Sequence, residues 1–197
     1  MSTMNYLWPV VGYLVGSIPM AILVARVFGL PDPRTTGSNN PGTTNILRYG
    51  GKAPAAVTLA GDVLKGALVV AVVQFAAPDP TVLALSGLGV FLGHLYPVFV
   101  RFQGGKGVAT ALGVWLVLVP WVGLLLLATW VVVAVAFRYS SLAALVAACL
   151  APVYVIWLAP IAAYVALGVA ITLLLVWRHR SNIRKLFAGT EGRIGAR

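Results

Sequence analysis

The chain alternates between long apolar runs and short polar ones. The apolar runs predict seven helices, at about 4–28, 53–76, 81–100, 107–118, 120–137, 141–157 and 160–178. Several runs exceed the ~18 apolar residues that indicate a membrane-spanning helix. Three polar stretches interrupt them, here named the first (34–48), second (101–110) and third (178–185) polar segments. The pattern predicts an all-α, polytopic membrane bundle of seven transmembrane helices.

The number of helices depends on how residues 107–137 are divided. As one kinked helix they would measure roughly 45 Å, too long for a ~30 Å hydrocarbon core unless strongly tilted. Pro120 suits a helix start better than a helix interior, so two helices are favoured. The first of them, 107–118, is short, which leaves open whether it crosses the membrane completely.

Composition indicates lipid surroundings and a defined orientation. The 197 residues are 60% hydrophobic and 9% charged, with a mean hydropathy of +0.96. The formal net charge is +10, from 14 Lys and Arg against 4 Asp and Glu. Because Lys and Arg accumulate on the cytoplasmic side of membrane proteins, we expect no nucleic-acid partner. With seven helices all three polar segments face the cytoplasm, the N-terminus lies outside, the C-terminus lies in the cytoplasm, and the outer side carries only Asp79.

Other residue counts restrict the chemistry. The beginning of the chain lacks a basic region and a small-residue cleavage site, so the first helix is expected to be retained. The single cysteine, Cys149, excludes an internal disulfide and a CxxC metal site. His94 and His179 are the only histidines, so we expect no histidine-rich metal centre. No metal and no cofactor are expected.

The second polar segment contains Gly104-Gly105-Lys106-Gly107 at the start of a predicted helix. Glycines permit close approach of the backbone to a ligand, and a helix N-terminus attracts anions. The segment is not a Walker A loop, because Val100 and Gly107 stand where that motif needs a glycine and a hydroxyl. Alone, it is equally consistent with a flexible cytoplasmic turn.

The first polar segment is rich in hydroxyl and amide groups. These residues favour turns, so an ordinary loop is one interpretation. Fifteen residues are many for a mere connection, however, and Arg34 and Arg48 have the geometry to bind a phosphate. In the third polar segment, His179 and Asn182 are expected on one face of a helix end.

Four polar residues elsewhere are assigned by spacing. Asp62 and Lys65 are i,i+3 in one helix, and we expect a structural ion pair. His94 either lines the site or forms a hydrogen bond within the bundle. Ser141 either caps the helix that begins there or adds a hydroxyl to the site.

Six stretches in order resemble the bacterial acyl-phosphate glycerol-3-phosphate acyltransferase family. They are GSIP (16–19), DPRTTGSNNPGTTNILR (32–48), GDVLKG (61–66), GHLYPVFVRFQGGKGVAT (93–110), RYSSLA (138–143) and HRSNIRKLFAGTE (179–191). The resemblance implies one inner-membrane acyltransferase domain over residues 1–197, with its active site on the cytoplasmic face. It would transfer a fatty acyl group from acyl phosphate to the sn-1 hydroxyl of glycerol 3-phosphate, giving lysophosphatidic acid and phosphate. That is the first acylation of bacterial phospholipid synthesis; protein partners are not indicated.

The resemblance also implies site residues. The expected catalytic residues are Ser38, Lys106, His179 and Asn182. The expected substrate- or phosphate-binding residues are Asn40, Gly42, Thr43, Asn45, Arg48, Gly104, Gly105, Gly107 and Ser141. Asn39 stands where the family usually has Gly; Asn tolerates left-handed backbone geometry better than most residues, so the loop is expected to keep its shape.

The sequence leaves one alternative for the proton acceptor and one for the function. The chain lacks the His-x-x-x-x-Asp pair of other glycerolipid acyltransferases, so either His179 deprotonates the glycerol hydroxyl or a substrate phosphate oxygen accepts the proton. We favour the second. An organic-anion transporter is the alternative function, but it would need polar groups across the bilayer midplane, where only Asp62 and Lys65 lie. A structural membrane protein would not need these motifs on one face.

Overall fold

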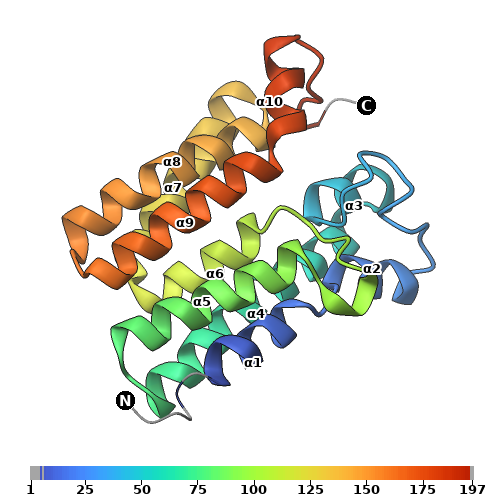
Figure 1. Ribbon diagram of the computed structural model, residues 1–197. Helices are drawn as coiled ribbons and strands as arrows, with labels where there is room; N and C mark the ends of the chain where they lie inside the picture. The colour runs from blue at the N-terminus through green and yellow to red at the C-terminus, as the bar shows by residue number, and fades with distance from the viewer. Residues whose placement is uncertain (1–4, 6, 196–197) are drawn as a thin grey trace. The chain divides into compact units, whose positions relative to one another are not determined.

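The computed structural model of the chain describes residue 5 and residues 7–195 (Figure 1). Residues 4 and 6, at the start of the first predicted helix, lie outside this range. Every regular element in the described part is helical, which confirms the all-α prediction. The chain divides into two compact units, the first ending at Leu118 and the second beginning at Val119.

Helices of the first unit follow the predicted order with two differences. They are α1 (Leu7–Gly16), α2 (Met20–Val27), α3 (Thr43–Gly50), α4 (Lys52–Ala76), α5 (Pro80–Leu95), the 3-10 turn η2 (Val98–Val100) and α6 (Val108–Leu118). The first predicted helix is broken rather than continuous, because Pro19 has no N–H to continue the helical ladder. The first polar segment is not all loop: its second half forms α3.

Helices α1 and α5 approach each other through glycines. Each carries two glycines one turn apart, Gly12 and Gly16 on α1 and Gly89 and Gly93 on α5. A Cβ added at Gly93 would overlap the carbonyl oxygen of Tyr13. Small residues of this kind let helix backbones come close in membranes, where packing rather than hydrophobicity drives association.

Prolines set two of the helix starts. Pro80 opens α5 after Asp79, whose Oδ1 accepts hydrogen bonds from the N–H groups of Thr81 (2.9 Å) and Val82 (3.0 Å). Pro120 opens α7, which confirms the division of 107–137 into two helices. At 11 residues, α6 spans roughly 16 Å, about half of a hydrocarbon core.

The second unit contains four helices in its described residues. They are α7 (Pro120–Phe137), α8 (Ser140–Leu158), α9 (Ala162–Arg178) and α10 (Arg180–Phe187). Helix α8 packs between α7 and α9, and α10 contacts both α8 and α9. The chain bends by 60° between α9 and α10.

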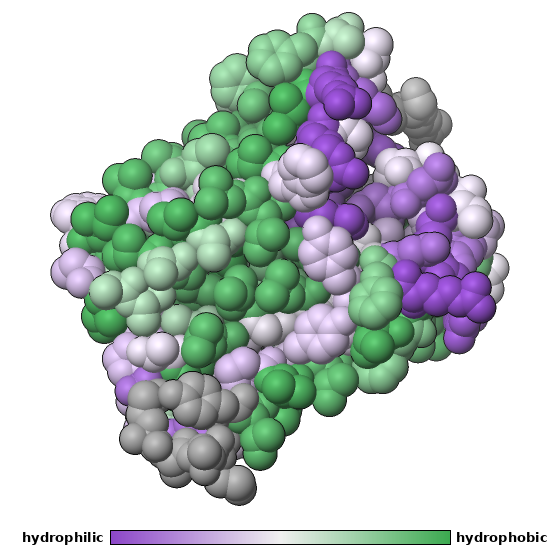
Figure 2. All heavy atoms as spheres, viewed as in Figure 1, coloured by the Kyte–Doolittle hydropathy of each residue, from purple (hydrophilic) through white to green (hydrophobic). Residues whose placement is uncertain are grey.

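Apolar side chains cover much of the outside of both units. Phe75 on α4 is 92% exposed, and Trp157 on α8 is 74% exposed. Figure 2 shows hydrophobic atoms along the helices, with hydrophilic atoms gathered over α3 in the first unit and over α10 in the second. Among the described residues, five helical stretches are long and apolar enough to cross a membrane: Leu7–Val27 (α1 with α2), Lys52–Ala76, Pro80–Val100 (α5 with η2), Pro120–Phe137 and Ser140–Leu158. The bent α9–α10 pair makes a sixth if it counts as one span. The exposed apolar surface is that of an integral membrane protein.

Candidate active site

The first polar segment is folded around the side chain of Asn45. This residue of α3 is 1% exposed. Its Nδ2 donates to the carbonyls of Pro33 (3.0 Å) and Thr36 (2.8 Å), and its Oδ1 accepts from the N–H of Ser38 (2.9 Å). Asn45 therefore binds the loop itself, and through the loop it holds Ser38 in place.

The remaining candidates of this segment lie on its surface. Ser38 and Arg48 are exposed, while Asn40, Gly42 and Thr43 are half-buried. Ser38, Asn40 and Gly42 precede α3 and Thr43 begins it, at the helix end that attracts anions, whereas Arg48 lies in its last turn.

The backbone of this loop adopts a left-handed conformation at Asn39. Asn39 has a φ of +55°, so the expected left-handed geometry is confirmed.

Arg34 binds Asp32 through both carboxylate oxygens, with Nη2 2.6 Å from Oδ2 and Nε 3.0 Å from Oδ1. The hydrogen bonds from Arg34 lower the pKa of Asp32. Asp32 therefore engages Nε and Nη2 of Arg34, and phosphate binding by Arg34 stays a prediction.

The glycines of the second polar segment lie against the end of α5. The N–H of Gly105 donates to the carbonyl of His94 at 3.2 Å. A Cβ at Gly105 would overlap the His94 ring and lie 3.0 Å from the carbonyl oxygen of Pro41. Gly107 has a φ of +85°, and Lys106 beside it is half-buried. Only glycine fits at 105, and the contact brings the first and second polar segments together.

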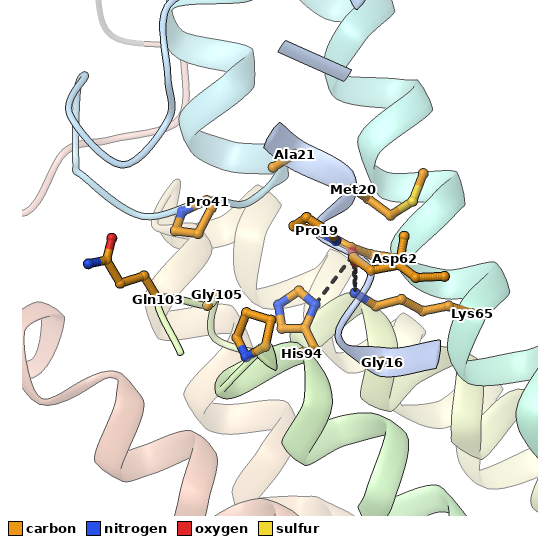
Figure 3. A pocket seen from close by; sticks show the side chains of 13 residues that line it. Gly16, Pro19, Met20, Ala21, Pro41, Asp62, Lys65, His94, Gln103 and Gly105 are labelled. Carbon is orange, nitrogen blue, oxygen red and sulfur yellow. Dashed lines mark hydrogen bonds and ion pairs between the residues drawn. The ribbon is translucent and has the colours of Figure 1, made fainter. Parts of the chain in front are cut away.

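A pocket opens at this meeting point (Figure 3). Its lining comes from the α1–α2 break, both polar segments and two helices: Gly16, Ile18, Pro19, Met20, Ala21, Pro41, Asp62, Lys65, His94, Pro97, Gln103, Gly104 and Gly105. Of the predicted site residues, Gly104 and Gly105 belong to this lining. Ser38, Arg48 and Lys106 lie outside it.

Three buried ionisable side chains form one wall of the pocket. Asp62 Oδ1 lies 2.8 Å from Lys65 Nζ and 3.3 Å from His94 Nδ1. Figure 3 shows His94 and Lys65 both directed at Asp62. The predicted ion pair is confirmed, and both predictions for His94 hold: it lines the pocket, and its Nδ1 lies 3.2 Å from Thr110 Oγ1. The position of this pair in the pocket wall was missed, although charges within spanning helices are a signal for function.

The third polar segment differs from a simple helix end. His179 lies at the junction, because α9 ends at Arg178 and α10 begins at Arg180. Its N–H and its ring Nδ1 both bond to the carbonyl of Leu175, at 3.0 and 2.9 Å. The ring nitrogen and the backbone N–H of His179 therefore share the carbonyl of Leu175, which lies in the last turn of α9. The carbonyl of His179 accepts the N–H of Ile183 at 2.9 Å, so His179 and Asn182 lie in the first turn of α10, after the bend.

Glu191 organises the polar residues of the second unit. Its Oε1 accepts from Ser141 Oγ at 2.6 Å and from Asn182 Nδ2 at 2.7 Å. The predicted cap by Ser141 is not formed: the N-cap position of α8 is Tyr139, and no side chain caps it. Sequence reasoning missed Glu191, although it is the only Glu in the chain and lies in a basic tail.

Relatives of known type match almost the whole chain. The family model described as glycerol-3-phosphate acyltransferase matches residues 6–189. A glycerol-3-phosphate acyltransferase of Bordetella petrii is 57% identical over 94% of this chain and 91% of the relative. One of Halorhodospira halophila is 54% identical over 95% of each.

Solved structures of an integral membrane glycerol 3-phosphate acyltransferase also match the chain. The crystal structure of PlsY (YgiH), an integral membrane glycerol 3-phosphate acyltransferase, in its glycerol 3-phosphate form matches with a TM-score of 0.93 at 36% identity. It covers 98% of this chain and 96% of that chain. The lysophosphatidic acid form of PlsY matches with a TM-score of 0.91 at 35% identity. The chain belongs to the glycerol-3-phosphate acyltransferase family of integral membrane enzymes.

Proposed function

We propose that this protein transfers a fatty acyl group from acyl phosphate to the sn-1 hydroxyl of glycerol 3-phosphate. The products are lysophosphatidic acid and inorganic phosphate. The observation that carries the proposal is the family match over residues 6–189, together with solved PlsY structures in glycerol 3-phosphate and lysophosphatidic acid forms. Those two ligands are a substrate and a product of this reaction. Acyl phosphate as the donor rests on the resemblance of the sequence to the acyl-phosphate family.

Phosphate binding is the main task of the first unit in this proposal. Both substrates carry a phosphate group, and helix N-termini with glycines and cations suit such groups. The glycines Gly104, Gly105 and Gly107 let the backbone approach a phosphate, and Lys106 adds a point charge. Ser38 and Arg48 are exposed at the first polar segment, where they are accessible to a ligand. Asn45 contributes by holding Ser38, and the remaining binding residues are Asn40, Gly42 and Thr43.

Orientation of the acceptor is the task of the second unit. The His179 ring is held in place by the contact of its Nδ1 with the Leu175 carbonyl. Asn182 and Ser141 are held by Glu191. We infer that a substrate phosphate oxygen accepts the proton of the glycerol hydroxyl and that His179 orients the hydroxyl. Acyl phosphate has a good leaving group, so positioning and anion stabilisation supply much of the catalysis.

The same proposal assigns membrane topology. We count seven transmembrane segments by adding the short α6 to the five candidate spans and the bent α9–α10 pair. With the N-terminus outside and the C-terminus in the cytoplasm of a bacterial inner membrane, the active site faces the cytoplasm. We assign residues 1–197 to one acyltransferase domain because the family match includes segments of both units.

The test is phosphate release by purified protein given palmitoyl phosphate and glycerol 3-phosphate. Release that requires both substrates and yields lysophosphatidic acid supports the proposal. Activity with acyl-CoA but not with acyl phosphate would contradict the proposal that acyl phosphate is the acyl donor. No release, with anion flux into proteoliposomes, would support the transporter alternative instead.

The role of His179 has its own test. A general base contributes about 10²–10⁴-fold to a rate. For His179→Gln we expect turnover within about tenfold of wild type, because an amide can still orient the hydroxyl. Complete loss of turnover with intact substrate binding would contradict this role and make His179 the base.

A further inference from the structure

The Asp62–Lys65–His94 cluster contains more ionisable groups than a structural ion pair needs. All three side chains are buried, with 2%, 6% and 8% exposure. Asp62 and Lys65 alone already balance their charges at 2.8 Å. Buried ionisable groups are costly in spanning helices and are usually retained for function. The recruitment of His94 from a second helix therefore calls for a reason beyond neutralisation.

His94 connects the cluster to the glycine turn at residues 104–105. Its backbone carbonyl accepts the N–H of Gly105 at 3.2 Å. The Nε2 edge of its ring occupies the space into which a Cβ of Gly105 would project. The second ring nitrogen, Nδ1, faces Asp62 Oδ1 at 3.3 Å and Thr110 Oγ1 at 3.2 Å. One nitrogen of the ring is therefore held by the helices while the opposite edge supports the turn.

Lys65 extends the cluster to the break in the first span. Its Nζ donates to the carbonyl of Ile18 at 3.1 Å. Ile18 lies between α1 and α2, where the helical ladder is interrupted. The cluster thus joins the α1–α2 break, α4, α5 and the glycine turn through one carboxylate.

We propose that Asp62, Lys65 and His94 are positioning residues that hold the Gly104–Gly105 turn in its substrate-binding shape. Asp62 lies 3.3 Å from the Nδ1 edge of the His94 ring and sets the orientation of that ring. Lys65 balances the charge of Asp62 and anchors it to the span break. The kinetic part of the test rests on the proposed function, in which this turn approaches a substrate phosphate.

The experiment uses two variants of the full-length protein. His94→Phe keeps a ring against Gly105 and leaves the Asp62–Lys65 pair intact, but it removes Nδ1. Asp62→Asn/Lys65→Met removes both charges together, so neither is left buried alone. In each we expect the KM for at least one phosphate-bearing substrate to rise about tenfold, equivalent to about 1.4 kcal/mol of binding. A mere loss of folded protein lowers the rate but leaves both KM values unchanged.

A second readout does not depend on the reaction. Lys106 is half-buried directly after the turn, whereas Arg193 is exposed in the other unit. We expect trypsin to cut after Lys106 faster in both variants than in wild type, relative to its cutting after Arg193. The control is Asp79→Ala, which removes the cap at the opposite end of α5 without touching the turn. It should lower thermal stability and change neither KM nor the cleavage ratio.

The outcomes separate the two proposals. Wild-type levels of both KM and Lys106 cleavage in His94→Phe, or equal changes in Asp79→Ala, would overturn the positioning role. If the wild-type protein transfers no acyl group from acyl phosphate, the proposed function fails, and the cleavage ratio still decides whether the cluster holds the turn.

Discussion

The side-chain Oδ1 of Asn45 accepts a hydrogen bond of 2.9 Å from the backbone N–H of Ser38. The two residues are seven positions apart in sequence, and the same side chain binds two further loop carbonyls. A residue on a helix thereby determines the shape of the loop in front of it. The position of Ser38, an expected catalytic residue, depends on this side chain.

Asn45→Ala tests this dependence. The change leaves three backbone groups without a partner, at about 1 kcal/mol for each hydrogen bond. We expect the free energy of unfolding to fall by about 2–3 kcal/mol and activity to fall more steeply than the folded fraction. Thermal unfolding in detergent and an acyltransfer assay measure the two effects. Leu47→Ala, an exposed change on the same helix, is the control and should have little effect.

Lys106→Met should reduce kcat/KM by about 100-fold or more, because a cation beside a developing anion contributes on this scale. Stability should change little, since the side chain is only half-buried. Steady-state kinetics with both substrates measures the loss. Lys52→Met, an exposed lysine at the start of α4, is the matched control. Equal losses in both variants would indicate a general effect of charge instead.

Glu191→Ala should affect activity more than Ser141→Ala. The Glu191 change removes the acceptor of two hydrogen bonds, whereas the Ser141 change removes one donor. Hydrogen bonds to a charged group contribute about 1.5–3 kcal/mol, so we expect at least a tenfold loss of kcat/KM for Glu191→Ala. Glu191→Gln retains an acceptor oxygen and should lose less. If Ser141→Ala were the most damaging of the three, a direct contact of Ser141 with substrate would be the better explanation.

Gly93→Ala should separate α1 from α5. The added methyl group would overlap the Tyr13 carbonyl, and backbone cannot move aside as a flexible side chain does. Overpacking of this kind costs about 1–3 kcal/mol, which thermal unfolding in detergent can measure. Leu85→Ala, an exposed change on the same helix, should be tolerated. An unchanged melting temperature for Gly93→Ala would show that the two helices can move apart freely.

The Asp32–Arg34 pair should contribute a small, pH-dependent stability. Hydrogen bonds from Arg34 lower the pKa of Asp32, so its contribution is present at neutral pH and is lost as the pH falls through the lowered value. Because both side chains are about one-third exposed, we expect at most about 1 kcal/mol. Melting temperatures of wild type and Asp32→Asn should differ at neutral pH and converge in acid. A difference that grows in acid would contradict this assignment.

Much of the helical order could be predicted from local properties. The apolar runs, Pro120 and the i,i+3 spacing of Asp62 and Lys65 predicted helices, a helix start and an ion pair that the structure has. The left-handed turn at Asn39 was expected from the glycine that the family usually has there and from the tolerance of Asn for this geometry. These features depend on neighbours in the chain, so composition and periodicity are sufficient to find them.

Sequence reasoning was less successful where polar groups choose among several partners. The three loop backbone partners of Asn45 were not predicted. Nor was the pairing of Arg34 with Asp32, two residues away. The contact of the His179 ring with the Leu175 carbonyl was not predicted either. Each outcome depends on a competition between hydrogen-bond partners that residue types alone do not decide.

By itself, the sequence determined a helical membrane protein, the order of its helices and the segments that carry its polar chemistry. The tertiary structure alone decided which distant groups meet. Ser141 and Glu191 are 50 residues apart, and His94 joins Asp62 from a different helix. The physical reason is that helix formation is driven by short-range periodicity and burial in lipid, whereas a side-chain hydrogen bond requires two atoms about 3 Å apart. Only the packed arrangement of helices and turns sets distances on that scale.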